Sequence, residues 1–327
     1  MKPRRLLPTE AFLLGCLVTA AAFTWGWIAW HRLINAALTV LPGIAFTMML
    51  MLGSDDVAER LQIWFDRRPR RIVIVPAGLW ALYVSYSIGA RVADAGIALL
   101  MAIYLAVPFL VLSINRKRKS PSWPEPVAIL WIWLPIELGL IRRVLMANQS
   151  LDLHYVFAQL LAINAGIIAF AVWKQTPNIG YRFEWDRRIV WTGILNFVVF
   201  AIIAIPLGMA IKFIQFNFYS TKLLEAPAVF AGVFLFTALP EEFLFRGLIQ
   251  NWIERTTKRP NASLALAAFI FGLAHLNNGH PIPNYKYFFM AAIAGIFYGQ
   301  AWRRTGTLMS SSFTHALVDT FWTVFFR

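Results

Sequence analysis

The stretch LPEEFLFRGLIQNWIE, residues 239–254, places Glu241, Glu242 and Arg246 at the end of an apolar run that begins near residue 226. An ionised side chain in hydrocarbon is costly, so charged residues persist in membrane segments mainly when they are paired or functional. In a helix, Glu242 and Arg246 lie one turn apart on one face and can pair, whereas Glu241 lies about 100° away. One carboxylate is then free to act as a general base. If the helix end instead reaches headgroup water, all three groups are simply solvated.

The composition is that of a multi-pass membrane protein. Of 327 residues, 59% are hydrophobic and only 14% are charged, whereas soluble domains carry about 25% charged residues. Lys and Arg outnumber Asp and Glu by 30 to 16, but they lie in short clusters between apolar runs, as membrane topology requires, which argues against nucleic acid as a partner. The single cysteine, Cys16, excludes a disulfide within the chain and a zinc–thiolate cluster.

Apolar runs of about 20 residues predict an all-α polytopic fold with about 10–11 transmembrane helices. The 127–141 run is short and could be re-entrant. The candidate spans are residues 11–30, 33–53, 72–90, 95–114, 127–141, 153–173, 190–214, 226–250, 264–283, 287–303 and 307–326.

Basic residues predict the orientation of these spans. With a cytoplasmic N-terminus, the inside segments hold 21 Lys and Arg and the outside segments hold 8, with Arg246 inside a helix. We therefore expect an integral membrane protein with its N-terminus in the cytoplasm, placed in the plasma membrane if the organism is bacterial. Residues 55–71 combine apolar residues at helical spacing with arginines, which predicts either an interfacial helix on anionic headgroups or an ordinary basic loop.

Two histidines in the late apolar runs extend the polar pattern. His275 ends FIFGLAH, and His315 lies four residues before Asp319 in SSSFTHALVDTFW. Counted from the nearest inside loops, Glu241 and His275 lie ~18–20 Å deep and His315 ~12 Å deep at 1.5 Å per helical residue. Three helices therefore bring titratable groups to a similar level of the membrane.

Three motifs carry a resemblance to a known family. EEFLFR at 241–246, FGLAH at 271–275 and HALVD at 315–319 resemble the motifs of the CAAX protease and bacteriocin-processing (CPBP, or Abi) family of intramembrane proteases. The resemblance covers about residues 220–327. We therefore divide the chain into residues 1–189, an N-terminal transmembrane region of unknown role, and residues 190–327, an intramembrane protease domain.

The resemblance implies hydrolysis of a peptide bond in a membrane-associated protein or peptide, within a cavity open to the cytoplasm. Glu241 would activate water, His275 would hold or polarise it, and Glu242 and Arg246 would form a structural pair. His315 and Asp319 would stabilise the oxyanion. The family more often has Asn at the last position, an amide donor, whereas an ionised Asp319 only accepts. Asp319 could instead donate when protonated, orient a histidine or bind a cation.

The cofactor and the reaction class have open alternatives. We favour chemistry without a metal, but Glu241, His275 and His315 are acceptable zinc ligands, although the chain lacks HExxH. A catalytically inactive scaffold or maturation partner would keep the same motifs. A proton-coupled carrier would also use mid-membrane Glu, His and Asp, but the chain shows no clear internal repeat. The expected partners are the lipid bilayer and a protein or peptide substrate, prenylated or not.

Overall fold

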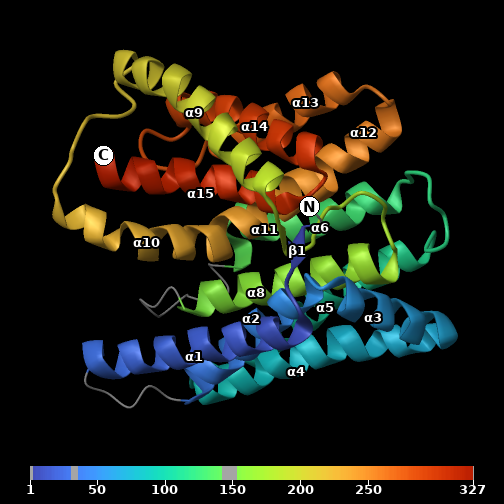
Figure 1. The fold of residues 1–327 in the computed structure, drawn as a ribbon. Coiled ribbons are helices and arrows are strands. Elements are labelled where there is room, and N and C mark those ends of the chain that lie inside the picture. The colour runs from blue at the N-terminus through green and yellow to red at the C-terminus, as the bar shows by residue number, and fades with distance from the viewer. Residues whose placement is uncertain (1–2, 31–35, 142–152, 327) are drawn as a thin grey trace. The chain divides into compact units, whose positions relative to one another are not determined.

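The computed structural model describes residues 3–30, 36–141 and 153–326, and these residues are almost entirely helical (Figure 1). The chain divides into two compact units, Arg5–Pro177 and Asn178–Arg327, the second of which also includes Met1–Arg4. The strands in the described part are the two-residue segments β1 (Arg4–Arg5) and β2 (Glu184–Trp185). The predicted all-α fold is confirmed. Along the sequence, the first unit ends at Pro177 and the second continues from Asn178. The functional boundary expected at residue 190 stays a prediction.

The N-terminal unit is a bundle of apolar helices packed around α8. Asn164 of α8 is fully buried and donates to the Ala45 carbonyl of α2 at 2.8 Å, so a polar contact fixes two otherwise apolar helices. The elements are α1 (Pro8–Trp30), α2 (Ala36–Leu52), α3 (Asp55–Arg67), the 3₁₀ segment η1 (Pro69–Val73), α4 (Ile74–Gly89), α5 (Ala95–Ser113), α6 (Pro124–Glu137), α8 (Leu153–Ile167) and the π-helical segment η2 (Ile168–Trp173).

Helix α3 lies where the sequence predicted either an interfacial helix or a basic loop. The chain turns by 92° between Leu38–Leu52 and Asp55–Arg67, so α3 runs nearly perpendicular to α2. A helix that is perpendicular to a membrane-spanning neighbour lies along the membrane surface, which fits the amphipathic pattern of α3. The helix is therefore present, and its position at the interface stays a prediction.

The C-terminal unit is built around a long helical span, Thr221–Thr257, that contains π-helical turns. Helices α9, α14 and α15 pack against one another beside it (Figure 1). The elements are α9 (Arg187–Ala210), α10 (Thr221–Val233), η3 (Phe234–Ala238), α11 (Leu239–Glu242), η4 (Phe243–Gln250), α12 (Asn251–Thr257), α13 (Pro260–Leu273), α14 (Tyr285–Thr305) and α15 (Leu308–Phe325).

A polytopic membrane protein is confirmed, and the expected number of 10–11 spans stays a prediction. In the described residues, five helices are long and apolar enough to cross a membrane, or six if the bent α2–α3 pair is one span. The predicted span 264–283 is wrong in its second half, because α13 ends at Leu273. A loop follows, in which Asn284 donates from its backbone to the Leu276 carbonyl at 2.7 Å and from its side chain to the Asn278 carbonyl at 2.9 Å.

Gly272 allows α13 and α14 to approach closely. A Cβ atom added at Gly272 would lie 2.7 Å from the Phe288 carbonyl oxygen and 2.9 Å from the Ala292 Cβ, whereas one added at Gly232 would meet no atom within 4 Å. Gly272→Ala is therefore expected to lower the unfolding free energy by about 1–3 kcal/mol. Gly232→Ala is expected to raise it by up to about 1 kcal/mol through helix propensity. Unfolding of both variants in detergent measures the difference, and equal stabilities would contradict this packing.

Candidate active site

Glu241 and Glu242 lie in α11, a short α-helical turn between the π-helical segments η3 and η4. A π-helical turn inserts an extra residue, which rotates the side chains that follow relative to a regular α-helix, and such turns are frequent at functional sites. As adjacent residues of a helix, the two glutamates point in different directions, and the π-helical segments lie on both sides of them. Their different surroundings follow from this placement.

Glu242 and Arg246 form the expected ion pair, and both side chains are buried. The Arg246 Nη1 donates to the Glu242 Oε1 at 3.0 Å, and its Nη2 donates to the Gly295 carbonyl of α14 at 3.0 Å. The guanidinium also stacks over the Phe271 ring, 4.5 Å from its centroid. Charge-assisted hydrogen bonds of this kind offset the desolvation of both ions.

His315 is the residue that joins this pair to the other acidic groups. Its Nδ1 lies 2.9 Å from the Glu242 Oε1, while its Nε2 lies 3.5 Å from the Asp319 Oδ2 and 3.9 Å from the Glu241 Oε2. The Tyr298 ring stacks on the imidazole with centroids 4.5 Å apart. Because carboxylates only accept hydrogen bonds, the ring suits these contacts best when both nitrogens carry hydrogen.

The position of His315 is fixed by hydrogen bonds between α15 and α9. Ser310 donates to the Ile189 carbonyl at 3.1 Å. The Thr314 hydroxyl lies 2.8 Å from the Ser310 carbonyl of its own helix and 3.3 Å from the Gly193 carbonyl of α9, so its one hydrogen is shared between them. The segment SSSFT before the histidine contains four residues with hydroxyl groups, and all four are buried: Ser310, Ser311, Ser312 and Thr314. The hydroxyl-rich sequence thus sets the register of α15 against α9.

His275 follows the end of α13 and lines the same cavity as Glu241 and His315. Its Nδ1 is 2.8 Å from the Phe271 carbonyl oxygen, which can only accept, so Nδ1 carries the hydrogen in this contact. In the neutral ring, Nε2 is then an acceptor. The imidazole packs between the rings of Phe271 and Tyr287, whose centroids lie 4.6 Å and 5.0 Å away.

A cavity of about 190 Å³ joins these groups, since Glu241, His275, His315 and Asp319 all line it. Glu242 and Arg246 are not among the lining residues. The Glu241 side chain is 34% exposed, although its Oε2 is buried without a hydrogen-bond partner. A water molecule occupies about 30 Å³ in the liquid, so the cavity has room for several. The structure therefore brings together the three residues that the sequence placed at similar depth, Glu241, His275 and His315, and adds Asp319.

Three further polar residues at this site were not predicted. Asn278 and Tyr287 line the cavity and Tyr298 stacks on His315, so amide and phenol donors are present beside the carboxylates. The sequence analysis predicted a membrane span over residues 264–283, which placed Asn278 within a helix and not in a loop at the site. The polar run LNNGH, residues 276–280, was the signal for the loop.

Glu241, His275 and His315, the residues proposed as zinc ligands, all line the one cavity. In the described part of the chain, no group of three His, Cys, Asp or Glu side chains is arranged to hold a metal ion. His315 uses Nδ1 for Glu242, and His275 uses Nδ1 for a backbone carbonyl. The structure thus offers Glu241, His275 and His315 as hydrogen-bonding groups, and whether the activity depends on a metal stays open to experiment.

Fold and site together define an integral membrane protein with a carboxylate–histidine site inside its helical C-terminal unit. Residues 223–321 match the model of a protein family described as type II CAAX prenyl endopeptidase Rce1-like, and all three sequence motifs lie within the match. The resemblance to CAAX proteases is confirmed for this region. The match supports a CAAX-type intramembrane endopeptidase in general, which acts on a membrane-associated protein. Comparisons with curated proteins and with solved structures gave no significant match.

Proposed function

We propose that the protein hydrolyses a peptide bond of a membrane-associated protein or peptide with water activated by Glu241. The observation that supports this most is that the Glu241 side chain lines the cavity shared with His275 and His315, whereas Glu242, whose Oε2 is equally buried without a hydrogen-bond partner, does not line it. The neighbouring carboxylate, Glu242, is occupied by Arg246 and His315. Of the two adjacent glutamates, only Glu241 is placed to accept a proton from water.

Each nitrogen and oxygen at the cavity has a role in the proposed reaction. Water donates one hydrogen bond to Glu241 and the other to the acceptor nitrogen of His275, which orients its lone pair. Glu241 takes the proton as the water oxygen attacks the carbonyl carbon, and the carbonyl oxygen becomes an oxyanion. His315 donates from Nε2 to that oxygen. Glu241 then passes the proton to the leaving nitrogen as the C–N bond breaks, which yields a carboxylic acid and an amine; the acid proton then moves to the amine, and the products are a carboxylate and an ammonium ion.

Asp319 is proposed to position His315 rather than to bind the oxyanion. It lies 3.5 Å from His315 Nε2, and an ionised carboxylate cannot donate to an oxyanion. Asp319→Asn is expected to retain activity within about tenfold, because the amide is nearly the same size as the carboxylate, keeps a polar oxygen beside His315 and adds a donor nitrogen. Asp319→Leu is expected to lose about 10²-fold or more. Steady-state cleavage of one reporter peptide measures both, and a smaller loss in the Leu variant than in the Asn variant would contradict this role.

The reaction class and the substrate are tested together in membranes. Membranes from cells with the wild type or with Glu241→Gln are compared by mass spectrometry of protein termini. The proposal expects shortened termini that occur only with the wild type and are reproduced by the purified, reconstituted protein. A reconstituted protein that binds such peptides without turnover would favour the inactive scaffold. Activity that survives exhaustive chelation would support chemistry without a metal, and loss restored only by zinc would overturn it.

A further inference from the structure

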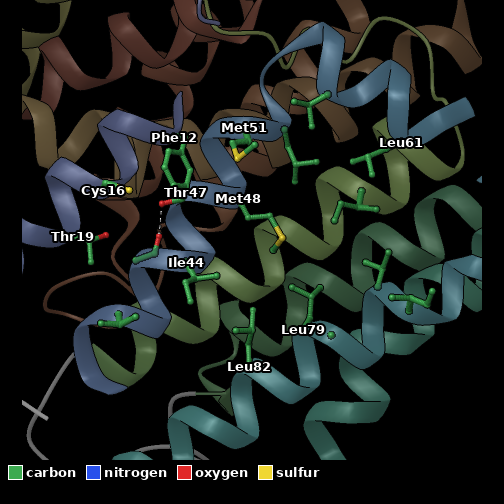
Figure 2. Close-up of a pocket in the computed structure, with 18 of the residues that line it drawn as sticks. Phe12, Cys16, Thr19, Ile44, Thr47, Met48, Met51, Leu61, Leu79 and Leu82 are labelled. Atoms are coloured by element: carbon green, nitrogen blue, oxygen red, sulfur yellow. Dashed lines mark hydrogen bonds between the residues drawn. The ribbon is translucent and has the colours of Figure 1, made fainter. Parts of the chain in front are cut away.

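A large cavity lies within the N-terminal unit and shares no residue with the site described above. It has a volume of about 990 Å³ and is lined by α1, α2, α3, α4 and a residue of η2. Figure 2 shows side chains from the first four of these helices around it, including Cys16, Met48, Leu61 and Leu79. This volume is at the upper end of the range for small-molecule sites.

The wall of this cavity is apolar even where the lining residues are polar by type. The Thr47 hydroxyl donates to the Gly43 carbonyl of its own helix at 2.7 Å (Figure 2). The Thr19 hydroxyl likewise donates to the Gly15 carbonyl at 2.7 Å. Their methyl groups and the surrounding aliphatic side chains remain for a ligand. A hydrocarbon chain matches such a surface, because the hydroxyl groups of Thr19, Thr24 and Thr47 are already hydrogen-bonded within their own helices.

One edge of the cavity is strongly basic. Trp64 lines the cavity, and the Arg71 guanidinium lies over its ring at 4.7 Å and donates to its carbonyl at 3.3 Å. In the described part of the chain, none of the five arginines in 60–71 lies within ion-pair distance of a carboxylate. These are Arg60, Arg67, Arg68, Arg70 and Arg71.

The acidic residues of the same segment are partly neutralised from outside it. Asp55 pairs with Arg5 at 2.6 Å, and Asp66 pairs with Arg116. After Asp66 the sequence RRPRR, residues 67–71, contains no acidic residue. The arginines beside the cavity therefore lack an anion. An anionic group held there would sit at the end of an amphipathic helix that runs perpendicular to α2, where lipid headgroups are found.

We propose that this cavity binds the acyl chain of an anionic phospholipid whose phosphate is held by the arginines of 67–71. The apolar cavity accepts the acyl chain, and the arginines without a carboxylate partner select the headgroup. The ligand is thus a resident lipid of the N-terminal unit. The inference does not depend on the proposed peptidase activity.

Cys16 provides the reporter, because it lines the cavity and is the only cysteine in the chain. Delipidated protein in mild detergent is alkylated with a maleimide, and the rate is followed by intact mass. Phosphatidylglycerol is expected to slow alkylation about tenfold when it is present at about ten times its Kd, whereas phosphatidylcholine at equal mole fraction slows it less than about twofold. High salt is expected to reduce the difference, because headgroup selection is electrostatic.

Two pairs of variants locate the lipid. Gly78→Phe adds a ring at a lining position where a Cβ atom meets nothing within 4 Å, and it is expected to abolish protection by occupying the cavity. Ala77→Phe, next to it but outside the lining, is expected to keep protection. Arg71→Gln is expected to remove the preference for phosphatidylglycerol, and the exposed Lys117→Gln is expected to keep it.

Three outcomes would overturn the proposal. Equal protection of Cys16 by both lipids would mean that the cavity binds any lipid and that the arginines do not select the headgroup. Protection by phosphatidylglycerol that persists in Gly78→Phe would place the lipid elsewhere. Protection that rises with protein concentration in the absence of lipid would assign the cavity to a second copy of the chain.

Discussion

Glu241→Gln is expected to lower the rate of peptide cleavage by about 10²- to 10⁴-fold, the usual contribution of a general base. The amide is nearly the same size as the carboxylate but cannot take a proton from water. Because the Glu241 Oε2 makes no hydrogen bond and only a 3.9 Å ion pair with His315, the substitution removes little that holds the fold. The loss should therefore appear in kcat, with binding of the substrate and unfolding in detergent nearly unchanged.

Glu225→Gln is the matched control for this substitution. Glu225 lies on the same helical span, in α10, and is exposed, so the variant removes one negative charge far from the cavity. We expect it to cleave at the wild-type rate. Full activity in Glu241→Gln would remove Glu241 from the mechanism, and equal losses in both variants would point to a general effect of charge.

Arg246→Met is expected to lower the unfolding free energy by about 3–5 kcal/mol, because it leaves Glu242 buried without its cation. Arg246 is 1% exposed and Glu242 is 0% exposed, so water cannot replace the lost contact. The substitution also removes the hydrogen bond to Gly295 that joins the long span to α14. The measurement is the midpoint of unfolding in detergent, followed by tryptophan fluorescence.

A second substitution separates charge from packing. In the double variant Glu242→Met and Arg246→Met, no ion is left unpaired, so we expect it to be more stable than Arg246→Met alone. A single Arg246→Met variant within about 0.5 kcal/mol of the wild type would show that Glu242 is neutral or hydrated. In that case the pair would not have the structural role proposed for it.

The sequence predicted those features of the site that depend on spacing along one helix. The Glu242–Arg246 pair follows from a separation of four residues, and the shared cavity of Glu241, His275 and His315 follows from their similar depth. The contact between His315 and Glu242 could not be predicted, because it depends on how two distant helices are rotated. Spacing carries no information about that rotation.

The length of α13 was misjudged for a related reason. Hydropathy extended the span to residue 283, although the chain leaves the helix at Leu273 and forms a loop fixed by Asn284. An average over a window of residues does not register single side-chain hydrogen bonds. The π-helical turns around α11 were also invisible to a pattern based on 3.6 residues per turn.

The hydroxyl contacts of α15 determine how the position of His315 responds to a change in the lipid bilayer. In lipid there is little hydrophobic force between helices, so apolar surfaces alone allow them to slide. Ser310 and Thr314 bond instead to fixed carbonyls of α9, which ties the height of His315 to a neighbouring helix. We expect the imidazole to keep its level relative to α9 when bilayer thickness changes.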